Sequence, residues 1–188
     1  MTLAAAQVRV AGNGEISIGV VGTASPPTDA STALGSGWTG LGYNTDAGLT
    51  VSRTVNVNDI LAWQSQVPVR KVPQDQACSV AGDFMQSNKD VVGLWYATST
   101  FAVATPSTDM KADASINPAL VTKAVCLDWE DGTMLFRLYI PKCQVTANGD
   151  QTLTRTGAVT YPLMFSAIAP DSGTTLFTLF TSDSTDFT

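Results

Sequence analysis

The side chains that could do chemistry in this chain are limited first by its lack of histidine. Histidine is the commonest general base near neutral pH and a usual zinc ligand, so the Ser-His and Cys-His arrangements of nucleophilic catalysis are excluded. Three carboxylates, Asp128, Glu130 and Asp131, lie close together in the sequence. They could form a cation site or a carboxylate pair for acid–base work. Because nothing in the sequence indicates a cleft, a solvated hairpin tip is the favoured interpretation.

Two other patterns are weaker still. Residues 35–40 have the glycine spacing of G-x-G-x-x-G, but no strand precedes them and no long helix follows, so a dinucleotide site is not expected. The three cysteines, Cys78, Cys126 and Cys143, show no C-x-x-C spacing, and an odd number fits buried thiols in a reducing compartment. We expect no cofactor, no metal site and no enzymatic activity.

The charge of the chain argues against a surface that grips DNA. The net charge is −6, from 10 Lys and Arg against 16 Asp and Glu, and nucleic-acid affinity comes mainly from basic side chains that neutralise phosphates. Charged residues make up only 14% of the chain, against about 25% in a typical soluble domain. This composition suits either a surface that is hidden against copies of itself or an ordinary β-protein with a neutral surface.

The first residues, MTLAAAQVRV, lack the basic leader of a signal peptide. No apolar stretch approaches the ~20 residues that a membrane helix needs. We therefore expect a soluble protein that stays in the cytoplasm where it is made and has no membrane partner.

Short strand-like runs separated by Gly, Pro, Asn and Asp predict a mainly β fold. The expected architecture is an antiparallel sandwich or barrel with one short α-helix and extended loops, in a single domain over residues 1–188. The expected strands are a hairpin over 6–21 about Asn13-Gly14 and single strands over 49–57, 77–84, 159–168 and 174–181. A helical turn is expected over 59–64, and a helix capped by Ser87 is expected over 88–97. The remaining segments are a loop or flexible arm over 22–37, a loop over 105–118 and an acidic tail over 182–188.

The clearest predicted hairpin covers residues 123–141 about an Asp131-Gly132 turn. The register that this turn sets pairs Trp129 with Met134 and predicts one apolar face that belongs to the core. The opposite face carries polar side chains, which include Asp128, Glu130 and Arg137. The same register places Cys126 opposite Arg137 and away from Cys143, so a disulfide between the two cysteines is not expected.

The four tryptophans divide into two pairs. Trp95 and Trp129 fall on apolar faces and are expected in the core. Trp38 and Trp63 fall in regions rich in turn residues. A tryptophan in such a place either pins a loop to the core or anchors an interface, and the sequence leaves both alternatives open.

One segment, residues 37–72, resembles the N-terminal half of the major tail tube proteins of phages, in particular those of long-tailed siphophages. It holds in order Gly37-Trp38, Leu41-Gly42-Tyr43, the acidic-glycine turn 46–48, the alternating strand 49–57 and the run Ile60-Leu61-Ala62-Trp63-Gln64, which leads into an extended basic stretch. A strand, one short helix and a strand-rich C-terminal half follow in the same order as in that family.

The resemblance implies a structural subunit of the virion tail, assembled in the host bacterial cytoplasm. Such subunits form rings, usually of six, and the rings stack into a tube through which genomic DNA passes without specific binding. The implied partners are further copies of the chain and the tape-measure, tail-terminator and distal-tail proteins. We expect Asp128 and Glu130 to face the lumen, and Trp38, Trp63, Val67 and Arg70 to contact neighbouring subunits.

Two other functions remain as alternatives. The first is a binding module, such as a capsid decoration or host-adhesion β-domain, which would share the missing catalytic groups and the Thr-rich strands. The second is a small glycan hydrolase, which needs two carboxylates ~5–10 Å apart in a cleft.

Overall fold

The structure is a computed structural model that describes residues 7–98, 101–104, 108–147 and 149–184. Within these ranges the chain is mainly β, which confirms the predicted fold class. The strands are β1 (Asn13–Gly19), β2 (Trp38–Gly40), β3 (Asn44–Ile60), β4 (Arg70–Phe84), β5 (Ala102–Val103), β6 (Met110–Lys111), β7 (Thr122–Asp131), β8 (Met134–Ala147), β9 (Tyr161–Ala167) and β10 (Thr178–Thr181), and the one α-helix of the described residues is α1 (Lys89–Trp95).

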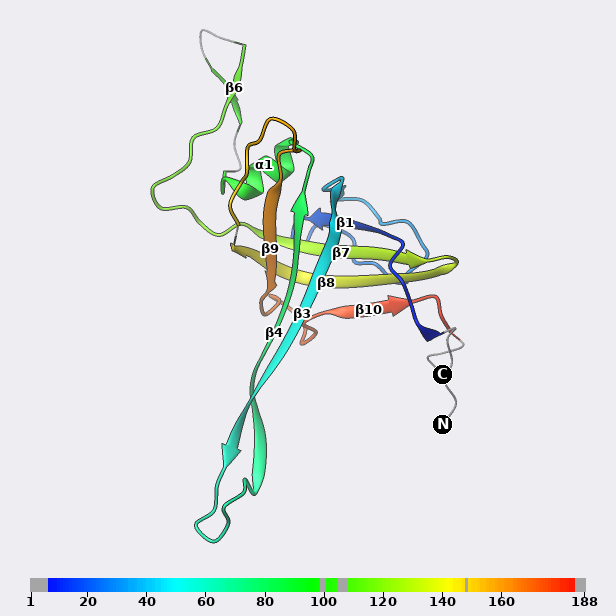
Figure 1. Cartoon of the computed structure of the whole chain (residues 1–188), viewed down its shortest axis with the longest axis vertical. Helices are drawn as coiled ribbons and strands as arrows, with labels where there is room; N and C mark the ends of the chain where they lie inside the picture. Colours follow the sequence, from blue (N-terminus) through cyan, green and yellow to red (C-terminus); the bar gives the residue numbers. More distant parts are fainter. Residues whose placement is uncertain (1–6, 99–100, 105–107, 148, 185–188) are drawn as a thin grey trace.

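Eight strands form one antiparallel sheet in the order β2-β1-β7-β8-β9-β4-β3, with β10 paired to β8. The long strand β8 joins two layers, because its first half pairs with β10 and its second half with β9. Strands β3, β4 and β9 therefore cross steeply over β1, β7, β8 and β10 (Figure 1). This is the arrangement of an orthogonally packed sandwich whose corner is a bent strand.

The core lies between these two layers. Phe84 of β4 meets Phe165 of β9 edge to face, with ring centroids 6.5 Å apart. Val91 and Leu94 of α1 add to the same apolar cluster, so the helix closes one end of the sandwich. The largest fully buried side chains are Phe84, Phe165, Ile16, Leu41, Ile140 and Leu163.

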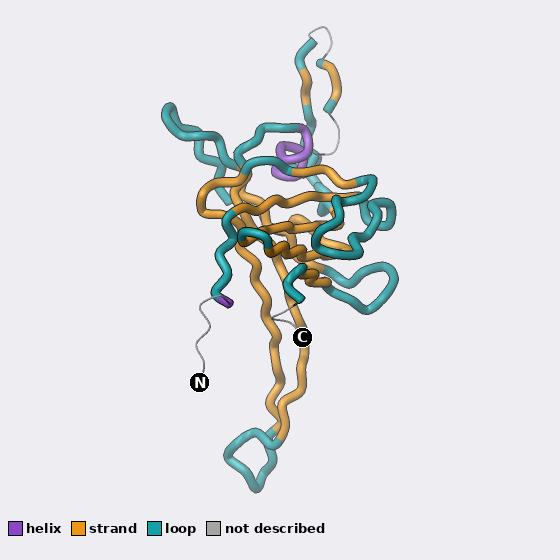
Figure 2. Tube along the Cα trace, turned by 90° about the vertical axis from the view of Figure 1, so that its right-hand side faces the viewer, coloured by secondary structure: helices purple, strands orange, loops and turns teal. Residues whose placement is uncertain are grey.

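The β3–β4 hairpin extends far beyond this core. Because β9 pairs only with residues 79–84 of β4, the outer part of the hairpin has no third strand among the described residues. We call residues 53–77 the arm and its end, residues 61–69, the tip. The arm projects from the body as a two-stranded ribbon (Figures 1 and 2), and nearly all of its residues are exposed.

The predicted hairpin about Asn13-Gly14 is wrong. Both residues lie in the continuous strand β1, which pairs with β7 so that Gly14 is opposite Trp129. Neither residue has the positive φ that a two-residue hairpin turn requires. A Cβ at Gly14 would lie 3.5 Å from the carbonyl oxygen of Asp128, which is an ordinary contact distance, so the strand does not depend on glycine at this position.

The predicted helical turn over 59–64 is also wrong, because Asn58–Ile60 continue the β3 ladder with β4. The helix over 88–97 exists but is shorter, and its N-cap is Asn88. The Asn88 side chain accepts a hydrogen bond from the backbone N–H of Val91 at 2.8 Å, whereas Ser87 accepts one from the Tyr161 hydroxyl. Both errors have one cause: Asn58 and Ser87 have side chains of the types that cap helices, and these types also occur in strands and loops.

The predicted strand over 77–84 is confirmed, and it begins earlier, at Arg70. The strand over 159–168 appears as β9, and only the end of the predicted strand over 174–181 is strand, as β10. The predicted loop over 105–118 contains β6, which pairs with β5, and its residues 105–107 lie outside the described residues.

The hairpin over 123–141 forms with its two faces as predicted but with a shifted register. Trp129 pairs with Phe136 instead of Met134, because the turn is made at Gly132, whose φ is 60°, and the residue after it. A shift of two residues keeps every side chain on its face. It does change the opposite partners, so that Asp128 and not Cys126 is opposite Arg137.

This division into a core and an arm predicts two different responses to truncation. Leu163→Ala removes a side chain that is 2% exposed, and we expect the free energy of unfolding to fall by about 2–5 kcal/mol. Val57→Ala removes arm surface that is 49% exposed, and we expect a change within about 0.5 kcal/mol. Urea unfolding of dilute protein measures both, and equal losses would contradict the division.

Candidate assembly surfaces

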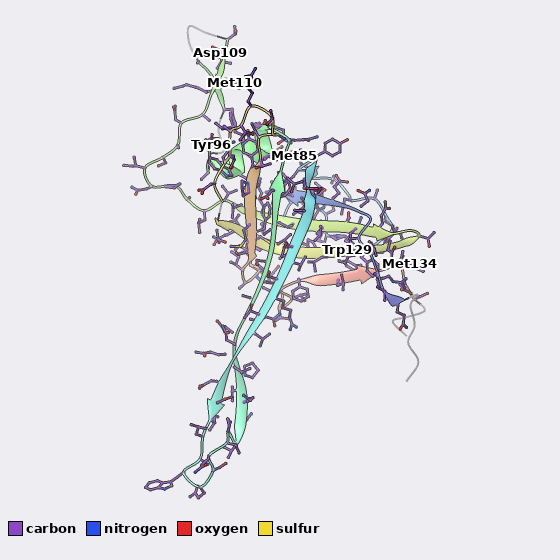
Figure 3. The ribbon with its side chains drawn as sticks, viewed as in Figure 1. Met85, Tyr96, Asp109, Met110, Trp129 and Met134 are labelled. Atoms are coloured by element: carbon purple, nitrogen blue, oxygen red, sulfur yellow. The ribbon has the colours of Figure 1, made fainter. Side chains whose placement is uncertain are left out.

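The acidic cluster lies at the outer end of the β7–β8 hairpin, where Figure 3 shows Trp129 and Met134. Asp128 forms a two-pronged ion pair with Arg137, in which Nε to Oδ1 is 2.7 Å and Nη2 to Oδ2 is 3.1 Å. Glu130 accepts a hydrogen bond from the Asn13 side chain, and Asp131 accepts one from the backbone N–H of Val10. These carboxylates are therefore engaged within the subunit. Among the described residues, no group of three or more His, Cys, Asp and Glu side chains could hold a metal ion.

Arg137 also holds the loop that precedes β2. Its Nη1 donates to the carbonyl oxygens of Asp29 at 2.9 Å and Thr32 at 2.7 Å, and the residue is only 6% exposed. The hydrogen bond to the Asp128 carboxylate is the main cause that raises the pKa of Arg137. Asp29 in turn accepts hydrogen bonds from the backbone N–H groups of Thr32 and Ser31, which lower the pKa of its carboxyl group. We call Arg137 and the groups that it binds, on Asp128, Asp29 and Thr32, the clamp. The sequence did not reveal the clamp, because the loop and the hairpin that it joins are far apart in the chain.

Trp38 directly follows the same loop and contacts it near its beginning, at Ser25. The indole Nε1 donates to the carbonyl oxygen of Ser25 at 2.8 Å, and the ring lies edge-on to Tyr139 with centroids 6.0 Å apart. Of the two alternatives for this tryptophan, the geometry favours pinning of the loop to the body. The mobility of residues 22–37 and a contact of Trp38 with a neighbouring subunit both stay predictions.

The other three predicted contact residues are grouped on the arm. Trp63 and Val67 lie in the tip, where they are 99% and 67% exposed. Arg70 begins β4 directly opposite Ile60. The nine residues of the tip carry no charge, so this end of the arm offers a neutral surface with aliphatic and aromatic side chains.

The two faces of the β3–β4 hairpin differ in chemistry because side chains alternate along each strand. One face continues the core face of β4, and it carries Val51, Val55 and Val57, which are 46%, 40% and 49% exposed. The other face is lined mainly by hydroxyl and amide side chains, and we call it the hydroxyl face. Its members on β3 are Thr50, Ser52, Thr54, Asn56 and Asn58, and their partners on β4 are Ala81, Ser79, Ala77, Asp75 and Val72.

The three cysteines are buried and unbridged, as the sequence predicted for the pair Cys126 and Cys143. Burial raises the pKa of the Cys126 thiol to about 12 and that of the Cys143 thiol to about 12. Because the thiolate is the reactive form of cysteine, we infer that these two thiols are chemically inert in the folded subunit.

The clamp predicts a stability difference between two ion pairs. Arg137→Met leaves the Asp128 carboxylate and two loop carbonyl groups without their donor, and we expect a loss of about 3 kcal/mol in the free energy of unfolding. Lys142→Met removes an ion pair whose Asp171 partner is 72% exposed, so its loss should stay below about 1 kcal/mol. Urea unfolding compares the two, and proteolysis within residues 22–37 should be faster only in the Arg137 variant. Equal losses of stability and equal rates of proteolysis in the two variants would show that Arg137 does not hold the loop.

Comparison with known proteins gives one finding and one negative result. A search of curated proteins finds no match at the significance required. The sequence pattern of a family described as phage tail tube protein matches residues 1–188, the whole chain. In the described part of the chain, no helix is both long enough and apolar enough to cross a membrane. The match over the whole chain agrees with the mainly β fold, and the chain belongs to the phage tail tube protein family, whose members are structural proteins of the virion tail.

Proposed function

We propose that this chain forms closed rings that stack head to tail into a hollow tube, through which DNA leaves the capsid for the host. The tube belongs to a long, non-contractile tail of the siphophage type. The family resemblance implies six subunits in a ring and contacts of the finished tube with tape-measure, tail-terminator and distal-tail proteins. We further propose that the chain is not an enzyme and works by assembly alone.

The observation that carries this proposal is the arm. Strand β3 is an edge strand over its whole length, and β4 from residue 70 to 78 pairs only with β3 among the described residues. Unpaired edge groups are a template for another strand, and a monomer normally blunts such an edge. Here the edge is long and carries exposed valines, and it is interrupted only by Arg53 and by a register shift at Asn56/Val57 opposite Pro73. A neighbouring copy that adds its own strands would satisfy both the backbone groups and the apolar side chains.

A ring is the assembly that leaves no edge open, as in a closed barrel. Contact of unlike surfaces on the two ends of a ring can then repeat without limit, because a heterologous contact does not close on itself. The arm projects from one side of the body (Figures 1 and 2). It is therefore suited to reach a subunit beyond its own ring.

The hydroxyl face is the surface that we propose for the lumen. Between Thr50 and Asn58 it carries no basic side chain on β3, and Asp75 is the one charged residue among their partners on β4. DNA is held mainly by Lys and Arg, so a neutral to acidic wall lets it slide. The lumen position expected for Asp128 and Glu130 stays a prediction, and it is less favoured because both carboxylates already bind neighbours within the subunit.

Removal of the exposed indole tests the role of the arm. We expect Trp63→Ala to leave a folded monomer that fails to polymerise, because the residue contacts little within its own subunit at 99% exposure. Size-exclusion chromatography and negative-stain microscopy provide the readout. Ile116→Ala, at a side chain that is 96% exposed on another part of the surface, is the matched control. Normal tubes from the Trp63 variant would show that the Trp63 side chain is not needed for assembly.

Added positive charge tests the lumen. Thr54→Lys combined with Ser79→Lys should leave tube assembly intact but slow DNA release from phage particles, most strongly at low salt, because lysines on the wall would bind phosphates. Glu130→Lys is the control, and we expect its release rate to be unchanged. The opposite pattern, with slow release only for Glu130→Lys, would place the β7–β8 hairpin in the lumen instead.

A further inference from the structure

An apolar hollow opens on the body where β3 passes over β1 and β7. Its volume is about 220 Å³, and its lining includes Leu127 and Trp129. Leu49 and Val51 of β3 also line it, together with Ala11. A hollow of this size is large enough to admit a side chain from another molecule.

A larger polar hollow of about 540 Å³ adjoins the apolar one and shares Ala11 and Gly14 with it. Its lining includes the carboxylates of Glu15 and Asp46 and the amide of Asn44. A buried tryptophan usually needs an acceptor for its indole N–H. The paired hollows therefore offer apolar walls and hydrogen-bond acceptors side by side.

The tip of the arm has the complementary chemistry. Trp63 is 99% exposed, and Leu61 and Val67 beside it are 66% and 67% exposed. The intervening side chains, Gln64 to Gln66, are uncharged donors and acceptors. A neutral tip with one large aromatic ring fits an apolar hollow that has a polar rim.

The tip cannot enter the hollow of its own subunit. Val51 at the hollow and Ile60 at the base of the tip are nine residues apart on one extended strand, which separates them by ~30 Å. The paired strands of the arm hold the tip away from the body (Figure 2). Only another copy of the chain can bring a tip to this surface.

We propose that the hollow of each subunit receives the Trp63 tip of a second copy, and that this is the contact which propagates from ring to ring. The inference rests on the proposed function and assigns to it a donor surface, an acceptor surface and a direction. Donor and acceptor are different patches, so the contact is heterologous and repeats along one axis. Successive copies are displaced by ~30 Å or more along the arm.

A mixing experiment tests this assignment. Ala11→Trp fills the acceptor and leaves the tip intact, and Ala11 is exposed, so the change does not disturb the core. Trp63→Ala removes the donor and leaves the acceptor intact. We expect each variant alone to form no tubes, and the mixture to form assemblies that stop at two copies or two rings, because only one productive contact remains. Analytical ultracentrifugation and negative-stain microscopy distinguish these sizes.

Ala112→Trp adds the same side chain at an exposed alanine away from the hollow and should polymerise normally. Normal tubes from Ala11→Trp, or a mixture that shows no complex, would overturn the assignment of the acceptor. Failure of the unmodified chain to form rings or tubes would instead overturn the proposed function. In that case the paired complex of the two variants still reports on the tip and the hollow.

Discussion

The constraint on which this structure depends is that the β3–β4 hairpin is longer than the body that supports it. Backbone N–H and C=O groups along a sheet edge need partners, and apolar side chains need to leave water. Residues 79–84 of β4 obtain both from β9 and the core. Among the residues that the structure describes, the arm obtains neither beyond its own two-stranded ladder. A second copy of the chain is the simplest source of what is missing.

The body shows the opposite condition. Its core is closed by two crossing layers and α1, and the polar face of the β7–β8 hairpin is covered by the loop that Arg137 and Trp38 hold. We expect a subunit of this kind to fold before it assembles, since its buried core lies outside the arm. The acidic cluster is a poor candidate for chemistry because its carboxylates already bind groups within the body. Its carboxylates serve to join the segment before β1, the hairpin and the loop.

Local patterns were enough to predict the fold class and the faces of the strands. Alternation along residues 123–141 gave the correct core face even though the register was shifted, because a shift of two residues preserves the alternation. Errors arose where one residue type serves two purposes. Gly14 looked like a turn residue but lies within β1 opposite Trp129, and Asn58 looked like a helix cap but lies in β3.

The candidate surfaces were less predictable for a physical reason. Alternating valines on β3 look the same in sequence whether their face meets a core or a neighbouring subunit. Trp63 could be identified as unusual, but its exposure could not. The acceptor hollow has no local signal at all, because Ala11, Leu49 and Trp129 meet only after the layers have crossed.

Hydrogen–deuterium exchange of monomer and assembled protein tests the central claim most directly. The account predicts that backbone amides in residues 53–60 and 70–77 exchange quickly in the monomer and become strongly protected on assembly, while those of β7 and β8 are protected in both states. Equal exchange of the arm in monomer and assembly would show that the strand edges are not completed by another copy, and would contradict the account.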